Sequence, residues 1–152
     1  MSLFDKNKLP LSKEEQEKVV AAIQQAENKT TGELRVFMEP NCTYVDAMDR
    51  AKEVFEELGM TATERRNAVL IYMAYADHQF AILGDKEIYI QAGGPEFWKH
   101  AAHIFQEHLR RGEMAEGFVA CINELGGALA KYFPHDPAVH RNELPDEIIF
   151  GK

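Results

Sequence analysis

The sequence predicts a single α/β domain, an α/β/α sandwich in which helices cover both faces of a small mixed sheet. Ala68–Tyr75 is a run of eight apolar or aromatic residues without polar alternation, which indicates a strand covered on both faces. Ala76–His78 interrupts the run, and β-forming residues resume at Gln79–Leu83, which is typical of an antiparallel hairpin. Segments with helical periodicity lie on both sides of this hairpin in the chain.

Two elements precede the hairpin. The first is a helix over residues 12–29, where Ser12 and Glu15 form a capping box and apolar residues recur every three or four positions. Thr31-Gly32 ends this helix, and the alternating segment Glu33–Glu39 predicts the first strand.

A second helix connects this strand to the apolar one. It spans residues 44–58 and ends at Gly59, a residue suited to the position after a helix. Asp46 and Arg50 lie four residues apart, a spacing at which they can pair on its flank. Strand, helix and strand then form a βαβ unit with a right-handed crossover.

The segment directly after the hairpin fits two secondary structures. Asp85 is a suitable cap for a short helix, whereas residues 88–91 also fit a strand, and periodicity does not separate the two over so short a run. A helix over residues 95–110 follows, with proline at its first position, and a last helix spans residues 114–133.

We divide the chain into a polar N-terminal segment (1–11), an α/β domain (12–133) and a C-terminal tail (134–152). A length of 152 residues fits one hydrophobic core. The tail contains one apolar patch, residues 148–150, which either docks as an edge strand or stays loose.

Charge and composition exclude several classes of protein. A formal net charge of −8 argues against nucleic acid or an anionic membrane as partner, because both attract basic surfaces. The start of the chain has no apolar signal region, and no apolar run reaches the roughly 18 residues that a membrane span needs. Cys42 and Cys121 lack metal or redox spacing and are expected as reduced thiols. We therefore expect a cytoplasmic monomer.

Strand pairing brings charged residues together at one edge of the sheet. If the turn is 76–78, residues whose numbers sum to about 154 lie opposite each other, so Asn67 faces Glu87 and Leu70 faces Gly84. The first strand is parallel to the central one and starts at the same edge. The residues gathered there are Glu33, Arg35, Arg65, Arg66, Asn67, Asp85 and Glu87.

This edge has the chemistry of a cation and phosphate site. Glu33 and Asp85 are the first-choice ligands of a divalent cation, either Ca²⁺ or Mg²⁺, with Asn67 as a neutral oxygen donor. Arg35 and Arg66 suit an anionic substrate such as a phosphate.

Two alternatives to that site stay open. The same residues fit a salt-bridged rim that only solvates the sheet edge, with Glu33 and Arg35 beside Phe37 on one strand face. Asp77 at the hairpin turn is a second candidate cation ligand. It lies at the opposite end of the strand, near the carboxyl ends of the parallel pair, where open α/β sheets bind ligands.

No familiar catalytic motif accompanies these residues. A cysteine phosphatase loop, C-x5-R, starting at Cys42 would need arginine where Met48 stands. The P-loop, G-x-G-x-x-G, H-E-x-x-H and G-x-S-x-G patterns are absent. The sequence therefore names no nucleophile.

The order and spacing of several short motifs resemble the TPM-domain family over about residues 12–133. These motifs are Thr31-Gly32-Glu33, Arg50-Ala51 with Phe55 and Leu58-Gly59-Met60, Arg66 to Leu70, Gly84-Asp85, and Arg111-Gly112-Glu113 with Gly117. The short stand-alone cytoplasmic members are the most similar, since they end in a segment like the one that starts at Asn142.

The resemblance implies an α/β/α sandwich, binding of divalent cations and, from some plant members, acid phosphatase activity. In such a reaction the metal would polarise a phosphoryl oxygen and activate water. The alternative function is a non-catalytic module that binds a protein partner, which the acidic charge and the missing catalytic motif favour.

Overall fold

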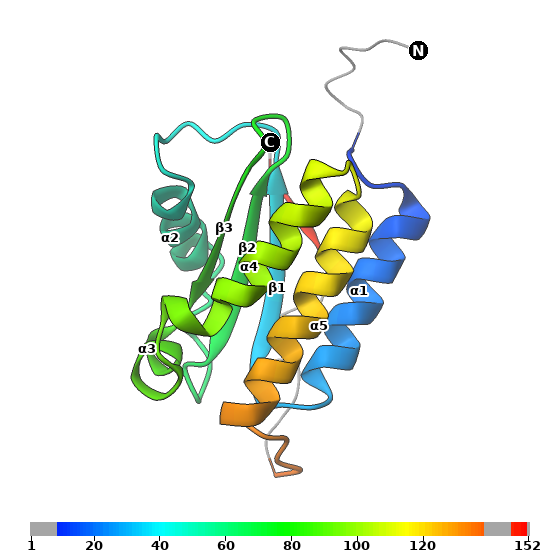
Figure 1. The fold of residues 1–152 in the computed structure, drawn as a ribbon. Coiled ribbons are helices and arrows are strands. Elements are labelled where there is room, and N and C mark those ends of the chain that lie inside the picture. The colour runs from blue at the N-terminus through cyan, green and yellow to red at the C-terminus, as the bar shows by residue number, and fades with distance from the viewer. Residues whose placement is uncertain (1–8, 139–146, 152) are drawn as a thin grey trace.

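A computed structural model describes residues 9–138 and 147–151 (Figure 1). The described chain forms a four-stranded sheet with the strand order β3-β2-β1-β4. Its elements are α1 (Lys13–Glu27), β1 (Glu33–Glu39), α2 (Ala47–Glu57), β2 (Ala68–Ala74), β3 (Gln79–Gly84), α3 (Lys86–Ala92), α4 (Pro95–Arg110), α5 (Met114–Tyr132) and β4 (Ile149–Phe150).

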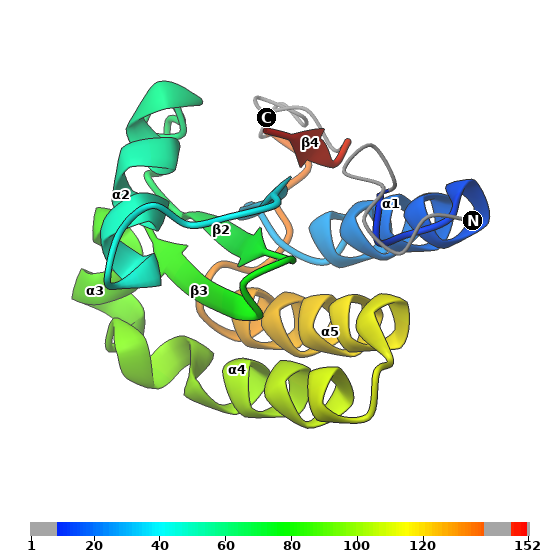
Figure 2. The same cartoon turned by 90° about the horizontal axis from the view of Figure 1, so that it is seen from above.

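Helices cover both faces of this sheet, which confirms the predicted α/β/α class (Figure 2). One face packs against α1, α4 and α5, where Phe105 and Phe118 are fully buried. The other face packs against α2 through Val54 and Phe55. Among the described residues, no helix is both long and apolar enough to cross a membrane.

The central strand is β2, as its apolar run predicts. Val69, Leu70, Ile71 and Tyr72 are fully buried, because each face of the strand meets a different helical layer. β1 lies parallel to β2, and β3 lies antiparallel to it.

The predicted hairpin register is wrong by one residue. Leu70 pairs with Leu83 and not with Gly84, which lies opposite Val69. The reason is the turn, which contains four residues, 75–78, because β2 ends at Ala74 and β3 begins at Gln79. A one-residue change in loop length moves the whole antiparallel ladder by one position.

The charged residues of β1 do not form the exposed rim that was one of the two alternatives for this end of the sheet. Glu33 and Arg35 are only 4% and 7% exposed, and every residue of β1 is buried. The chain after α2 covers this face, and the Arg35 Nη1 donates a hydrogen bond to the Leu58 carbonyl oxygen at 3.4 Å. When helices cover both faces of a strand, neither face is exposed to solvent, and its polar residues are buried as well.

Local capping signals are largely confirmed at the helix ends. Ser12 and Glu15 form the reciprocal capping box of α1. Asp85 is the N-cap of α3, so the helical interpretation of this segment is the correct one. Asp46 does not pair with Arg50, because its carboxylate caps α2 by accepting a hydrogen bond from the Met48 backbone N–H at 2.9 Å.

The apolar patch of the tail docks as an edge strand. Ile149 pairs with Phe37 and Phe150 with Met38, so β4 lies parallel to β1. The Gly151 backbone N–H donates to the Met38 carbonyl oxygen at 2.7 Å. The segment that starts at Asn142 lies outside the described residues up to residue 146.

Candidate functional site

The amino ends of β1 and β2 meet the end of β3 at one edge of the sheet, as the strand directions predict. Here the Arg66 guanidinium donates to both carboxylate oxygens of Asp85, at 2.6 and 2.9 Å. Asp85 is 5% exposed and also accepts a hydrogen bond from the Lys86 backbone N–H at 2.7 Å. The hydrogen bonds from Arg66 to Asp85 raise the pKa of Arg66, which stays charged.

The backbone of Arg66 is held in an uncommon conformation. Its φ is 51°, in the left-handed region that residues with a side chain rarely adopt. Its carbonyl oxygen accepts a hydrogen bond from the Glu87 backbone N–H at 3.0 Å. The loop before β2 is therefore fixed to the start of α3 by both the side chain and the backbone of one residue.

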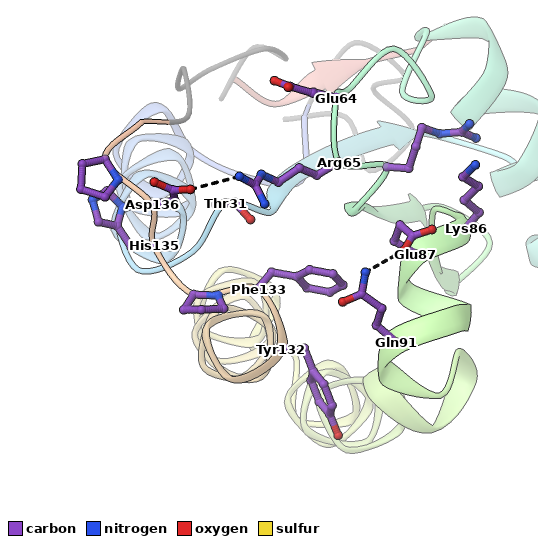
Figure 3. Close-up of a pocket in the computed structure, with 13 residues that line it drawn as sticks. Thr31, Glu64, Arg65, Lys86, Glu87, Gln91, Tyr132, Phe133, His135 and Asp136 are labelled. Carbon is purple, nitrogen blue, oxygen red and sulfur yellow. Dashed lines mark hydrogen bonds and ion pairs between the residues drawn. The ribbon is translucent and has the colours of Figure 1, made fainter.

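Arg66 also lines a pocket of about 640 Å³, which we call the amino-end pocket. Figure 3 shows the residues that line this pocket. Its volume lies in the range of about 300–1,000 Å³ that is typical of small-molecule sites. The basic residues that line it are Arg65, Arg66 and Lys86, and the acidic ones are Glu64, Glu87 and Asp136. The pocket therefore gathers charged groups from three separate segments of the chain.

The far wall of the pocket is the segment Phe133–Pro137, which we call the strap. The Phe133 carbonyl oxygen accepts hydrogen bonds from the Thr31 backbone N–H at 3.0 Å and from the Thr30 hydroxyl. Thr30 also forms an isolated antiparallel bridge with Pro134. The strap is thus attached to the start of β1, although 103 residues separate Thr30 from Phe133 in sequence.

The residues expected as cation ligands at this edge make other contacts. Both oxygens of Asp85 bind Arg66, and the Asn67 amide donates to the Thr31 hydroxyl oxygen at 3.1 Å. Glu33 is buried at the start of β1. Within residues 9–138 and 147–151, no group of three histidine, cysteine, aspartate or glutamate side chains is placed to hold a metal ion.

The two arginines expected to bind an anion occupy different places. Arg66 lines the amino-end pocket, with Arg65 and Glu87 from the same predicted group. Arg35 is buried on the α2 face of the sheet, where desolvation lowers the pKa of its guanidinium while the Glu147 and Glu33 carboxylates oppose that change. The structure thus brings together part of the group that the strand pairing predicts.

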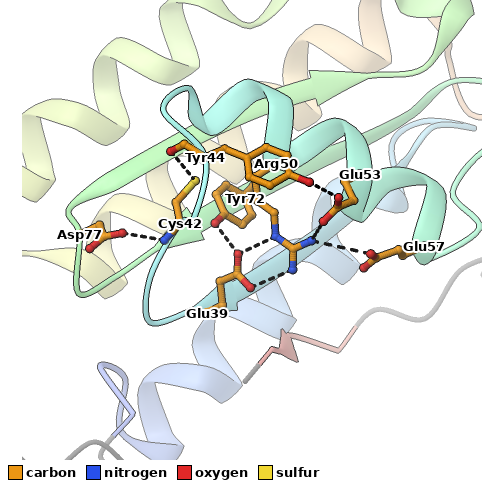
Figure 4. Close-up of polar contacts among 8 residues, drawn as sticks. All are labelled: Glu39, Cys42, Tyr44, Arg50, Glu53, Glu57, Tyr72 and Asp77. Atoms are coloured by element: carbon orange, nitrogen blue, oxygen red, sulfur yellow. Dashed lines mark hydrogen bonds and ion pairs between the residues drawn. The ribbon is translucent and has the colours of Figure 1, made fainter.

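A second polar cluster lies at the carboxyl ends of β1 and β2 (Figure 4). Arg50 of α2 donates to both oxygens of Glu39, at 2.8 and 2.9 Å, and contacts Glu53. The Tyr72 hydroxyl donates to the same Glu39 carboxylate at 2.5 Å. Glu39 is 5% exposed and Tyr72 is fully buried. The cluster binds α2 to the sheet, and its central carboxylate is already occupied by protein donors.

Asp77 lies at this second end, as its position in the turn predicts. It accepts hydrogen bonds from the Asn41 amide at 2.8 Å and from the Cys42 backbone N–H at 2.6 Å. These two hydrogen bonds lower the pKa of Asp77, which therefore stays ionised. Its contacts join the hairpin turn to the loop after β1.

The sequence did not indicate the strap, Lys86 or several other lining residues, which are Thr31, Glu64, Gln91 and Tyr132. Lys86 follows Asp85 directly, but its role as a pocket residue depends on where α3 begins. Asp136 lies in the segment assigned to the tail, and its contact with Arg65 spans 71 residues. No local pattern in the sequence points to so distant a pairing.

Fold and site together define a class: a small open-sheet α/β domain with a charged pocket at the amino ends of its parallel strands. The TPM domain model matches residues 5–128, and the chain belongs to this family. This confirms the resemblance drawn from the short sequence motifs.

Solved structures agree with this assignment. The NMR structure of BA42 protein from the psychrophilic bacterium Bizionia argentinensis is 38% identical, covers 99% of this chain and 100% of its own, and superposes with a TM-score of 0.87. The N-terminal domain of cg2496 protein from Corynebacterium glutamicum is 14% identical, with a TM-score of 0.65 over 89% of this chain and 84% of its own, and shows the fold alone. No curated protein matches the sequence.

Proposed function

We propose that this TPM domain binds a small phosphate-bearing ligand in the amino-end pocket. The observation that carries the proposal is the convergence of Arg65, Arg66 and Lys86 on one pocket of an otherwise acidic protein. Guanidinium and ammonium groups are the preferred protein partners of phosphate oxygens. Charged donors on separate loops, held by a rigid sheet, are also the usual way in which α/β domains build a ligand site.

The three basic groups differ in how firmly they are held. Asp85 fixes the Arg66 guanidinium with two hydrogen bonds, so Arg66 presents its charge in one place. Arg65 forms a single hydrogen bond to Asp136 at 3.1 Å, and both side chains are more than 40% exposed. Lys86 is exposed at the first position of α3. A ligand phosphate would therefore contact one fixed cation, Arg66, and two cations with mobile side chains, Arg65 and Lys86.

The pocket is larger than a phosphate ion, so the ligand carries an organic group. Phe133, Pro134 and Pro137 supply apolar surface for that group, while Gln91 and Thr31 supply polar atoms. Hydrolysis of a phosphate ester, which the family resemblance implies, is a separate step, for which the described lining of the pocket offers no cysteine or serine as nucleophile. Binding is therefore the activity proposed, and turnover of an ester is a further property to be measured.

Replacing Lys86 with glutamine tests the proposal. We expect the Kd for inorganic phosphate, measured by isothermal titration calorimetry, to rise about three- to tenfold, because an exposed charged donor is replaced by a shorter neutral one. Lys99→Gln is the matched control, since Lys99 is a 77% exposed lysine on α4 and does not line the pocket. Equal effects of the two substitutions, or no phosphate binding by the wild-type protein, would contradict the proposal.

The divalent cation implied by the family is a separate question. Asp85 gives both oxygens to Arg66, and Asp77 gives both to Asn41 and Cys42, so neither carboxylate offers a cation the open oxygen face that Ca²⁺ or Mg²⁺ needs. These donors do not fit a resident cation, and we derive no step from one.

A calcium titration followed by backbone NMR tests the expected ligands directly. Any cation at Asp85 has to displace Arg66, so we expect binding only at concentrations of about 1 mM. Shifts centred on Glu33, Asn67 and Asp85 would place the cation at the amino ends of the strands, and shifts centred on Asp77 would place it at the opposite end. Saturation at micromolar Ca²⁺ would contradict this prediction, because it would show that the contacts of these carboxylates with the protein do not hinder cation binding.

A further inference from the structure

The amino-end pocket contains an internal carboxylate that occupies one of its cations. The Arg65 Nη2 donates a hydrogen bond to the Asp136 Oδ2 at 3.1 Å, across the pocket from the loop before β2 to the strap (Figure 3). A carboxylate presents to arginine the same pair of acceptor oxygens that a phosphate does. In this contact Asp136 therefore takes the place that a ligand phosphate would take on Arg65.

Asp136 is held in position for this contact. Its second oxygen, Oδ1, accepts a hydrogen bond from the Ala138 backbone N–H at 2.9 Å, which orients the carboxylate within the strap. The strap is itself bound to the start of β1 through Phe133 and Thr31. The carboxylate thus belongs to a fixed wall of the pocket, and Arg65 is the partner that has to move.

The two ion pairs of the pocket differ in how easily a ligand can open them. Asp85 is 5% exposed, binds Arg66 at two points and caps α3, so opening that pair would leave a buried charge without a partner. Arg65 and Asp136 are 45% and 42% exposed and share one hydrogen bond. Water can solvate both groups when they separate, so this pair is weak.

We propose that Asp136 is an internal competitor that sets the affinity of the amino-end pocket for phosphate. The Arg65 guanidinium leaves Asp136 and binds the ligand phosphate instead, while the Arg66–Asp85 pair stays closed. This inference rests on the proposed function and adds the contact that regulates it. It predicts the unusual result that removing a charge from the pocket wall improves binding.

The test compares Asp136→Asn with the wild-type protein by isothermal titration calorimetry with inorganic phosphate at pH 7.5. Asparagine keeps the acceptor oxygen for Ala138 and loses the charge that holds Arg65. We expect a two- to fivefold lower Kd, which corresponds to the small contribution of an exposed ion pair. Arg65→Gln is expected to raise the Kd instead.

Glu107→Gln is the matched control for net charge. Glu107 is also paired with an arginine, at 3.2 Å, and is 41% exposed, but it lies on α4 and does not line the pocket. We expect its Kd to equal that of the wild type. If Glu107→Gln tightens binding as much as Asp136→Asn does, the effect is one of overall charge and the inference is wrong.

A double variant separates competition at Arg65 from a change elsewhere in the strap. In the Arg65→Gln background, Asp136→Asn should have no further effect on the Kd, because there is no guanidinium left to release. If the wild type binds phosphate and Asp136→Asn binds it equally well or more weakly, the inference is wrong and the proposed function stays intact. Absence of phosphate binding in the wild type and in Asp136→Asn alike would overturn both.

Discussion

Replacing Glu39 with alanine is expected to lower the free energy of unfolding by about 3 kcal/mol, the low end of the range for breaking a buried ion pair. The substitution removes the carboxylate that accepts both hydrogen bonds from Arg50 and the one from Tyr72. Tyr72 is fully buried and the Arg50 side chain is only 16% exposed, so neither donor regains water easily. Their unmet hydrogen-bonding capacity, more than the lost attraction, destabilises the protein.

Urea denaturation at pH 7 measures this effect, with Glu57→Gln as the control. Glu57 also faces Arg50, at 3.8 Å, but is 58% exposed, so its loss should change the free energy of unfolding by less than about 0.5 kcal/mol. A Glu39→Ala protein as stable as the Glu57→Gln protein would show that the cluster does not hold α2 on the sheet.

The same carboxylate gives the stability a defined pH dependence. Burial alone would raise the pKa of Glu39, but the hydrogen bonds from Arg50 and Tyr72 outweigh it and leave the pKa lowered. A carboxyl with a lower pKa in the folded state stabilises the protein above its unfolded pKa of about 4.3, and this contribution is lost as the pH falls. The stability difference between wild type and Glu39→Ala should therefore narrow from pH 7 toward pH 3.

Replacing Asp85 with alanine is expected to destabilise the protein by about 2–3 kcal/mol and to loosen α3. Two contributions combine: the N-cap of α3, which accounts for about 1 kcal/mol, and the partly buried ion pair with Arg66. Arg66 would keep its left-handed backbone without the side-chain contact that holds it. We expect the substitution to speed up hydrogen exchange of the α3 backbone amides more than that of the α5 backbone amides.

Asp46→Ala separates the two contributions. Asp46 is also the N-cap aspartate of a helix, α2, but it is exposed and forms no ion pair within the part of the chain that the structure describes, so its loss should cost only about 1 kcal/mol. The difference between the two variants in urea denaturation then measures the Arg66 pair. Equal destabilisation by both would mean that Asp85 acts only as a cap, and that Arg66 is free to move in the pocket.

Features encoded within a few residues were predictable from the sequence. The apolar run of β2, the capping box at Ser12 and the proline that begins α4 each act through neighbours on the same segment. Strand directions follow from the βαβ order, and with them the edge of the sheet at which Arg66 and Asp85 meet. The fold class, and the end of the sheet at which Arg66 and Asp85 meet, were therefore predictable from short segments and their order.

The partners of the charged residues were decided only by the tertiary structure. Arg50 binds Glu39 on the neighbouring strand and not Asp46 on its own helix, because burial of the strand carboxylate makes the distant partner the one that needs a cation. Arg65 contacts Asp136 for a different reason: both side chains are more than 40% exposed, and the attachment of the strap beside β1 brings them together. Helical spacing limits which residues can meet, but desolvation selects among them, and desolvation depends on packing between segments that are far apart in the chain.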